Sequence, residues 1–454
     1  MILLRKIQNL IPNIVFFLLL SVGFNLLADQ TPENTILFQN ESDLLLIGKQ
    51  TYFLEDKEGK LSIEEILKPE TQNKFQLNQN SVFTKQPTAS AFWLKLNIEN
   101  QSGKDAWLEL GSTFLWTIDY YANRNGKYEL ITETGSLRPD TNKAYPSNLF
   151  WLPLGNQKEE QFIYIRIHTG RPIVVPIQVG SIQSLVINKT KHDFLAAGFI
   201  GVMSIMFLYN LFLFLVTKDN LYLWYIGYVF FVTPAVMQNH NYSLFNFIFP
   251  ENISKFLHIH PYIFLSMPFI MIGYFAIHFL DLQKTFIIKG MVQILSIYSS
   301  ILFSISDLFN LWMPHIQVRI NQPIGLLGLI NLFGISLYFW LTNKNKNARF
   351  YCFAWFSVIL GLSIYILTVN GIFEYTFWNR NALQVGVGIE AFMFSLALGD
   401  RIKTLQHENL RLVENQNHRL EQTVIERTRE LRLNQGLLQL STNNLKAILD
   451  NTQQ

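Results

Sequence analysis

The sequence predicts a multidomain membrane protein with an extracytoplasmic all-β sandwich, a seven-helix transmembrane bundle and a C-terminal α-helical coiled coil. Three observations predict this architecture. Seven apolar stretches follow one another between residues 194 and 398, with only short polar breaks. An alternating, aromatic-rich segment precedes them, and a highly charged heptad segment follows them. The 454 residues are 49% hydrophobic and only 15% charged, which is too apolar for an ordinary soluble protein.

Composition also argues against several classes of function. The net charge of +3 is small and gives no reason to expect a nucleic-acid partner. The single cysteine, Cys352, lies in an apolar stretch and excludes an intrachain disulfide or a Cys-based zinc site. His258 and His260 are two residues apart, so they do not share a helix face. We therefore expect neither a metal site nor a cofactor.

The first 28 residues have the pattern of a secretory signal peptide. Arg5 and Lys6 form the positive region, residues 14–27 form the apolar region, and Ala28 is a small residue before a cleavage point. The pattern predicts cleavage. If cleavage fails, the segment remains as an eighth span with the same topology, because its charged end stays in the cytoplasm.

Residues 29–190 are expected to form the outer β-sandwich. Short runs alternate at strand period, at residues 92–98, 107–110 and 162–167, and turn-forming residues separate them. Several short strands at this spacing favour an antiparallel sandwich. The aromatic residues Trp116, Tyr120, Tyr121 and Trp151 are candidates for stacking on a sugar ring. The alternative is that they pack the core of the sandwich.

Residues 191–400 are expected to form the bundle, because a bilayer core requires about 20 apolar residues per helix. The seven candidate spans are residues 194–216, 221–237, 256–280, 286–306, 322–341, 350–369 and 382–398. One set of connections contains Lys218, Lys284, Lys344, Lys346, Arg349, Arg401 and Lys403, and the other contains Lys255, Arg319 and Arg380. The richer side is cytoplasmic by the positive-inside rule, which places residues 29–190 outside.

A carboxylate stands in the middle of the last span. Placing Glu390 there costs about 2.5–3.5 kcal/mol on insertion scales, so it should face the bundle and find a polar partner. Asn210 and Asn331 are the candidate partners. One interpretation is a signalling hinge or a proton-sensitive latch, and the other is a hydrogen bond that holds helices together.

Residues 401–454 are expected to form a cytoplasmic coiled coil and, through it, a parallel homodimer. The seam positions recur at alternating steps of three and four, and they include Leu410, Val413, Asn417, Leu420, Val424, Leu431 and Leu438. His407 lacks the nearby proline of a phosphoacceptor helix, and no glycine-rich ATP-binding segment follows. We therefore expect no catalytic residues and no enzyme activity in this chain.

The chain resembles the bacterial seven-transmembrane receptors with diverse intracellular signalling modules, from about residue 29 to the C-terminus. The strings that carry the resemblance are Phe92-Trp93-Leu94-Lys95, Trp107-Leu108-Glu109-Leu110, Asp119-Tyr120-Tyr121, Phe162-Ile163-Tyr164-Ile165-Arg166, Tyr209-Asn210-Leu211-Phe212, Asp219-Asn220-Leu221-Tyr222-Leu223, Ser395-Leu396-Ala397-Leu398-Gly399-Asp400-Arg401-Ile402 and Val424-Ile425-Glu426-Arg427-Thr428-Arg429-Glu430-Leu431. The first four are similar to the family's type-2 extracellular domain.

The resemblance implies a jelly-roll outer domain that binds carbohydrate or a similar small ligand, in a bacterial inner membrane. It also implies an output such as a histidine kinase or a nucleotide cyclase, of which this chain carries no recognisable residue. We expect a sensory receptor that signals through its coil to a separate effector. The alternatives are the truncated or split sensory half of a receptor histidine kinase or nucleotide cyclase, and a membrane transporter.

Overall fold

The computed structural model describes residues 35–156, 158–242, 244, 249–309, 314–342 and 348–452. The predicted signal peptide lies outside the described residues, as do Lys344 and Lys346. By internal contacts the chain forms two compact units, Met1–Phe394 and Ser395–Gln454. Within the first unit we call residues 35–181 the outer domain and residues 182–394 the bundle.

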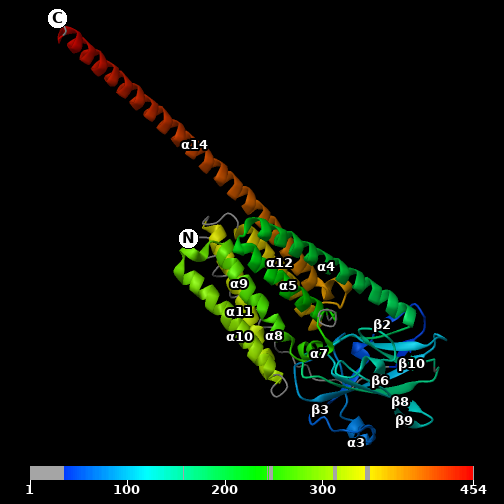
Figure 1. The fold of residues 1–454 in the computed structure, drawn as a ribbon. Coiled ribbons are helices and arrows are strands. Elements are labelled where there is room, and N and C mark those ends of the chain that lie inside the picture. Colours follow the sequence, from blue (N-terminus) through cyan, green and yellow to red (C-terminus); the bar gives the residue numbers. More distant parts are fainter. Residues whose placement is uncertain are drawn as a thin grey trace. The chain divides into compact units, whose positions relative to one another are not determined.

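The outer domain is built from two main β-sheets (Figure 1). In spatial order, the larger sheet contains β4 (Gln76–Leu77), β3 (Tyr52–Asp56), β6 (Ala91–Asn100), β11 (Gln161–His168), β8 (Thr117–Arg124) and β9 (Lys127–Thr134). The short β1 (Ile36–Phe38) pairs in parallel with β6. The smaller sheet contains β10 (Phe150–Gly155), β7 (Ala106–Leu110), β13 (Ile177–Gly180) and β2 (Leu44–Leu46). The predicted strands at 92–98, 107–110 and 162–167 are confirmed as β6, β7 and β11.

The main core lies between the two sheets, as the alternation in the sequence predicts. Leu94 of β6 and Ile165 of β11 meet Leu108 of β7 and Val179 of β13 there, all with 0% exposure. Successive side chains of a strand point to opposite faces. Trp93 is therefore on the other face of β6, in a second cluster with the short helix α2 (Ile63–Ile66). Two packed sheets with this interior make a β-sandwich.

Turn-forming residues and prolines limit the strands at two places in the outer domain. Asn125 and Gly126 join β8 to β9 with positive φ angles of 54° and 83°, the conformation that suits a tight hairpin. Pro172 and Pro176 flank the three-residue strand β12 (Ile173–Val175), which pairs only with β5 (Phe83–Lys85) among the described residues. Proline lacks the N–H that a central strand needs, so this segment is confined to a short pairing.

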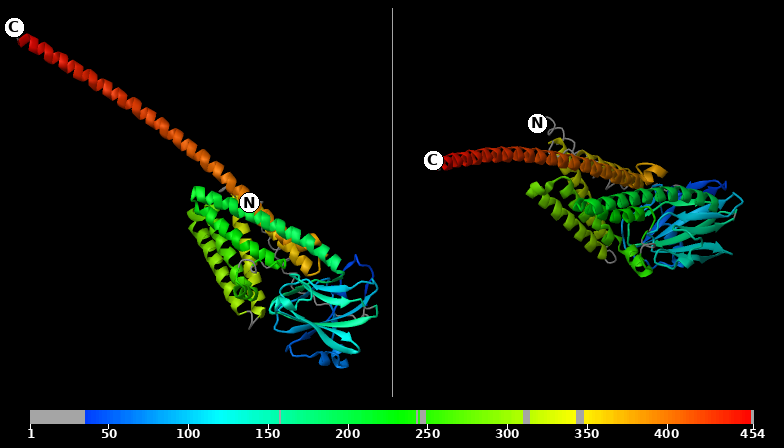
Figure 2. Two further views of the ribbon diagram at one scale, coloured as in Figure 1. Left: turned by 45° about the vertical axis from the view of Figure 1, so that its right-hand side comes forward. Right: turned by 45° about the horizontal axis from the view of Figure 1, so that its top comes forward.

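The bundle begins without a loop after the last strand of the sandwich. Ser181 follows β13 and caps α4, with its side chain accepting a hydrogen bond from the N–H of Ser184. The helix α4 (Ile182–Thr217) starts twelve residues before the predicted span, so the predicted domain boundary at residue 190 falls inside a helix. Figure 2 shows α4 leaving the sheets and running along the other helices of the bundle.

The remaining helices follow the predicted order. They are α5 (Asn220–Asn239), α7 (Glu251–Ile259), α8 (Pro261–Leu265), α9 (Met267–Phe279), α10 (Phe286–Leu308), α11 (Pro314–Leu341), α12 (Ala348–Val369), α13 (Phe377–Arg380) and α14 (Ala382–Thr452). The predicted third span at residues 256–280 is retained as a candidate span from Tyr262 to Phe279, but it is not one continuous helix, because the predicted stretch contains parts of α7, α8 and α9. Pro261 and Pro268 each begin a new helix, since proline fits the first turn but breaks a helix interior.

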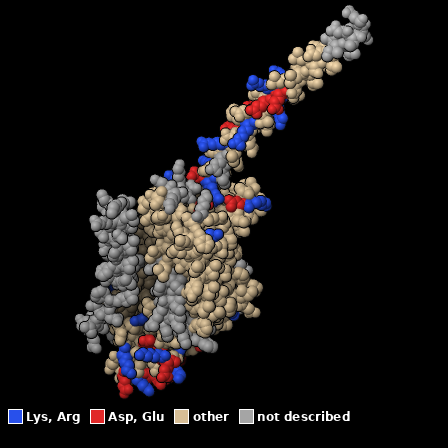
Figure 3. Space-filling model, turned by 90° about the vertical axis from the view of Figure 1, so that its left-hand side faces the viewer, with Lys and Arg blue, Asp and Glu red and all other residues tan. Residues whose placement is uncertain are grey.

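Six helices in the described part of the chain are long and apolar enough to cross a membrane. The described apolar stretch of α11, Leu327–Leu341, is shorter than the others, so a count of seven spans stays a prediction. On the face drawn in Figure 3 the helices of the bundle carry almost no charged side chains, whereas charges of both signs gather on the outer domain. This distribution is typical of a lipid-facing surface.

The second unit is the C-terminal part of α14, which is one continuous helix from Ala382 to Thr452. The predicted last span and the predicted coil are thus parts of the same helix. The seam side chains are exposed on the single chain, for example 61% for Leu410 and 68% for Leu420. A second chain is needed to bury them, so the coiled coil stays a prediction.

Leu94→Ala should lower the free energy of unfolding of the outer domain by about 2–5 kcal/mol, because it empties space between the two sheets. The matched control is Leu37→Ala, since Leu37 is 44% exposed on β1 and should cost less than about 0.5 kcal/mol. Denaturant titration of the purified chain compares the two. Equal costs would contradict the position of the core.

Candidate functional site

A buried ion pair joins the outer domain to the bundle. Arg171 lies in the loop after β11 with 3% exposure, and its guanidinium is 3.4 Å from Oδ1 of Asp307 near the end of α10. Arg171 also donates a hydrogen bond to the carbonyl of Ile259 at 2.8 Å. The other carboxylate oxygen of Asp307 accepts from the N–H groups of Tyr262 at 2.9 Å and Ile263 at 3.3 Å. These contacts compensate two charges that would be costly to bury alone.

An asparagine makes a second connection at the end of α5. Asn241 has a φ of 68°, in the left-handed region that asparagine tolerates better than most residues. Its Nδ2 donates to the carbonyl of Gly111 at 2.9 Å, and its Oδ1 accepts from the N–H of Thr113 at 3.1 Å. A third contact joins the hydroxyl of Thr84 to the carbonyl of Val369, at the end of α12. The outer domain is thus bonded to the ends of α5, α10 and α12.

A polar recess lies beside the Asn241 contact. It is small, with room for about one water molecule. Both parts of the first unit contribute to its lining, which consists of Glu109, Asn148, Leu149, Asn188, Lys189, His192, His240, Asn241, Tyr242 and Arg380. Because the lining comes from β7, α4, α13 and the segment after α5, a bound molecule would contact the outer domain and the bundle together.

Burial sets the electrostatics of the recess. Glu109 is 3% exposed and accepts a 2.6 Å hydrogen bond from Nε1 of Trp151, while burial raises the pKa of the Glu109 carboxyl. Burial and the positive charge of Arg380 lower the pKa of His240 to about 3. The imidazole is therefore neutral at pH 7. Lys189 pairs with Asp193 at 2.5 Å, so its charge is balanced.

Three of the four aromatic side chains predicted to bind a ligand are buried. Trp116, Tyr120 and Trp151 are 7%, 1% and 2% exposed, which leaves no ring face open for a sugar. The alternative of core packing fits these three in the structure. Tyr121 is partly exposed, and ligand contact by this set stays a prediction. Trp151 lies next to the recess through its hydrogen bond to Glu109.

The partner of Glu390 is a tyrosine that the sequence reasoning did not consider. Glu390 is 0% exposed, and the hydroxyl of Tyr228 on α5 lies 2.7 Å from each of its carboxylate oxygens. One turn away in the same interface, the hydroxyl of Tyr225 donates to the carbonyl of Ala391 at 2.8 Å. Two tyrosines therefore fix α5 against the start of α14.

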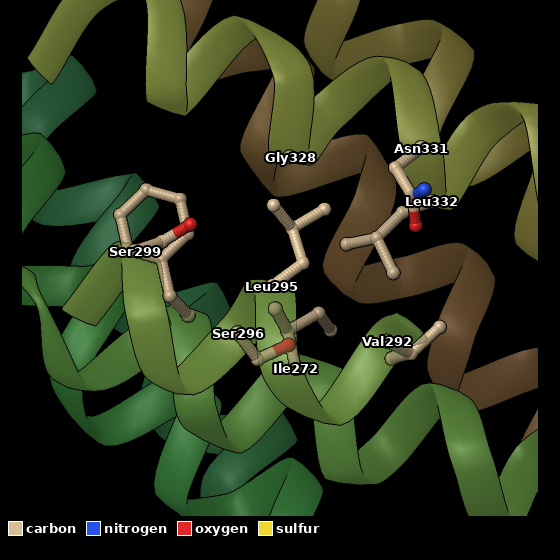
Figure 4. Close-up of a pocket in the computed structure, with 9 residues that line it drawn as sticks. Ile272, Val292, Leu295, Ser296, Ser299, Gly328, Asn331 and Leu332 are labelled. Atoms are coloured by element: carbon tan, nitrogen blue, oxygen red, sulfur yellow. The ribbon is translucent and has the colours of Figure 1, made fainter. Parts of the chain in front are cut away.

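The two asparagines proposed as partners of Glu390 each have a described contact elsewhere. Asn210 is fully buried on α4 and donates through Nδ2 to the carbonyl of Met206 at 2.8 Å. Asn331 lines a small pocket among α9, α10 and α11 (Figure 4). Glu390 is not among the residues that line this pocket. A signalling role for either asparagine stays a prediction.

The predicted seam lies along the exposed part of α14, and its seven positions are all exposed, namely Leu410, Val413, Asn417, Leu420, Val424, Leu431 and Leu438. A single helix does not test their pairing. Within the described residues, no group of three or more His, Cys, Asp or Glu side chains is placed to hold a metal ion.

Two family models match the chain. The model described as 7TM diverse intracellular signalling matches residues 192–401, and the model described as 7TMR-DISM extracellular 2 matches residues 48–181. The chain belongs to the seven-transmembrane receptors with diverse intracellular signalling modules. No curated protein matches it. The receptor is therefore a transmembrane sensory protein, and the two matched parts are sensory rather than catalytic domains.

Removing Arg171 should destabilise the receptor strongly. Arg171→Ala leaves the Asp307 carboxylate buried without its cation, which costs about 3–5 kcal/mol. Arg171→Ala combined with Asp307→Asn should recover part of this loss, because the uncompensated charge is removed. Thermal unfolding of the purified receptor measures both. Lys60→Ala is the control, since its pair with Glu58 is 80% and 78% exposed and should cost at most about 1 kcal/mol.

Tyr228→Phe should cost about 1–3 kcal/mol, because it keeps the ring and leaves the buried Glu390 carboxyl without its hydrogen-bond donor. Tyr209→Phe is the matched control, since Tyr209 is 43% exposed on α4. Thermal unfolding in detergent compares the two variants. If they are equally stable, the Tyr228–Glu390 hydrogen bond does not contribute to the packing of α5 against α14.

Proposed function

We propose that the receptor lies in a bacterial inner membrane with its outer domain in the periplasm and its C-terminal helix in the cytoplasm. A small ligand binds outside, and carbohydrate is the first class to test because the family resemblance implies it. Binding changes the arrangement of the bundle, and α14 transmits the change to a cytoplasmic parallel dimer. A separate effector protein reads the state of that dimer.

The observation that carries this proposal is the set of connections between the outer domain and the bundle. Arg171 bonds to α10, Asn241 couples the end of α5 to the loop after β7, and the chain itself continues from β13 into α4. A ligand shifts an equilibrium only as far as it binds one state better than the other. Because the outer domain is bonded to several helix ends, a ligand-dependent change in it acts on the bundle directly.

The continuity of α14 supports the second half of the pathway. The helix contains Glu390, which bonds to Tyr228, and it continues without interruption to the predicted seam. At about 1.5 Å per residue, the part from Arg401 to Thr452 is roughly 75 Å long. Polar residues such as Asn417 at seam positions weaken a coiled coil and set its register. A marginal seam suits a helix that changes rotation or register on signalling.

Seam positions should crosslink between two receptors, and the yield should change with ligand. In a Cys352→Ala background, cysteines replace Leu420 and Leu431 on the seam. Disulfide formation in membranes is measured by gel electrophoresis, with and without a panel of neutral and acidic glycans. We expect dimers at both seam positions, because a parallel coil brings identical residues together.

The matched controls are Glu421→Cys and Arg432→Cys, each one residue away from the seam. These cysteines should crosslink weakly. Equal yields at all four positions would contradict a parallel coil along this seam. If the seam positions crosslink but no ligand in the panel changes the yield, the dimer is supported. The proposed transmission of a signal from these ligands through α14 is then contradicted.

A further inference from the structure

The Glu390 carboxyl keeps spare hydrogen-bonding capacity inside the bundle. It is fully buried, and the Tyr228 hydroxyl of α5 is its only hydrogen-bond partner in the described part of the chain. A carboxyl group offers several lone pairs as acceptor sites, whereas one hydroxyl supplies a single proton. The neighbouring Tyr225 hydroxyl already donates to the carbonyl of Ala391. The carboxyl can therefore accept further hydrogen bonds.

Two buried donors on the helix α12 lack an acceptor. Tyr351 is 0% exposed and Trp355 is 5% exposed. Among the described residues, the hydroxyl of Tyr351 and Nε1 of Trp355 have no hydrogen-bond partner. The two residues are one helical turn apart, so they lie on the same side of α12. An unpaired polar group away from water is costly. The interior of the bundle thus contains an acceptor with spare capacity and two unused donors.

The packing of α12 against α14 places the indole donor beside the carboxyl. The ring centres of Tyr351 and Phe394 are 5.1 Å apart. The hydroxyl of Ser357, later on α12, donates at 3.0 Å to the carbonyl of Gly386, which is earlier on α14. The two helices therefore run antiparallel. The indole lies one turn after Tyr351 and the carboxyl lies one turn before Phe394, so the two groups are level with each other.

Small residues allow α12 and α14 to approach closely near this level. A Cβ atom on Gly386 would lie 2.6 Å from the carbonyl oxygen of Ser357. A Cβ atom on Gly361 would lie 2.4 Å from the carbonyl oxygen of Ala382. Backbone therefore meets backbone at these two points, as small residues permit between membrane helices. A rotation of α14 about its axis carries the carboxyl away from α5 and toward the donors of α12.

We propose that the Glu390 carboxyl is a two-position switch. In this structure it accepts a hydrogen bond from Tyr228 of α5, and in a second state it accepts from the two unused donors of α12. The proposal rests on the receptor function proposed above and names the step that turns α14, the helix that leads into the predicted seam. Exchange of one buried hydrogen bond for another keeps the two states close in free energy, so a modest difference in ligand affinity shifts the equilibrium between them.

The indole N–H of Trp355 reports which position the carboxyl occupies. The full-length receptor is labelled with isotope-enriched tryptophan, purified in detergent and studied by two-dimensional NMR. The signal that disappears in Trp355→Phe is the Trp355 resonance. Tyr228→Phe should shift this resonance downfield, because the carboxyl without its α5 donor moves to the donors of α12. The matched control is Tyr209→Phe on the exposed side of α4, which should leave the resonance unchanged.

A double variant shows whether the new acceptor is the carboxyl. Tyr228→Phe combined with Glu390→Met should return the Trp355 resonance to its original position. Tyr228→Phe combined with Glu390→Asp is the substitute if the methionine variant does not fold. Its shorter side chain should give a smaller downfield shift than Tyr228→Phe alone. An unchanged resonance in Tyr228→Phe, or a full shift that persists in the double variants, would overturn the proposal.

This readout does not involve the seam, so the switch and the proposed function can fail separately. A downfield shift in Tyr228→Phe without any change in seam crosslinking would support the switch and contradict transmission through the coil. Seam crosslinking that responds to a glycan, with no shift of the Trp355 resonance in Tyr228→Phe, would support the receptor function and overturn the switch.

Discussion

Asp307 has no access to water, and the cation that neutralises it comes from a different part of the chain. The Arg171 guanidinium crosses from the outer domain to reach it, and two backbone N–H groups hold the remaining carboxylate oxygen. Separating the outer domain from α10 would leave both charges without partners at a low-dielectric site. Buried pairs add little net stability, but breaking one is expensive. The pair therefore favours a docked junction over any arrangement in which the two parts move apart.

This constraint explains why the other connections can be weaker. Asn241 and Thr84 contribute neutral hydrogen bonds, each worth on the order of 1 kcal/mol. Such bonds can exchange while Arg171 keeps the parts together. The recess lies among these neutral contacts and contains Arg380, so it borders the bonds that are easiest to rearrange. A junction with one strong and several weak contacts allows local change without dissociation.

Local patterns in the sequence predicted the helices and strands. They did not predict which side chains far apart in the sequence contact each other. Alternation at residues 92–98 gave β6, and hydropathy located the bundle helices. The start and the continuity of the third span were not predicted, because mean apolarity does not show where Pro261 and Pro268 begin new helices. Tyr228 was missed because a tyrosine in an apolar helix resembles ordinary packing. Arg171 and Asp307 are 136 residues apart, and no periodicity in one sequence connects them.

The aromatic residues of the outer domain illustrate the same limit at the site itself. The sequence suggested that these aromatic rings stack on a sugar. In the structure Tyr120 and Trp151 are buried in the sandwich instead, because large rings bury much apolar surface. The polar groups that converge instead lie at the junction, on elements far apart in the sequence. Trp151 links the two regions, since its indole fixes Glu109 at the edge of the recess. Packing of the sandwich thus positions a carboxylate at the point where the outer domain meets the membrane helices, and a shift in either part changes the field that Arg380 and His240 experience.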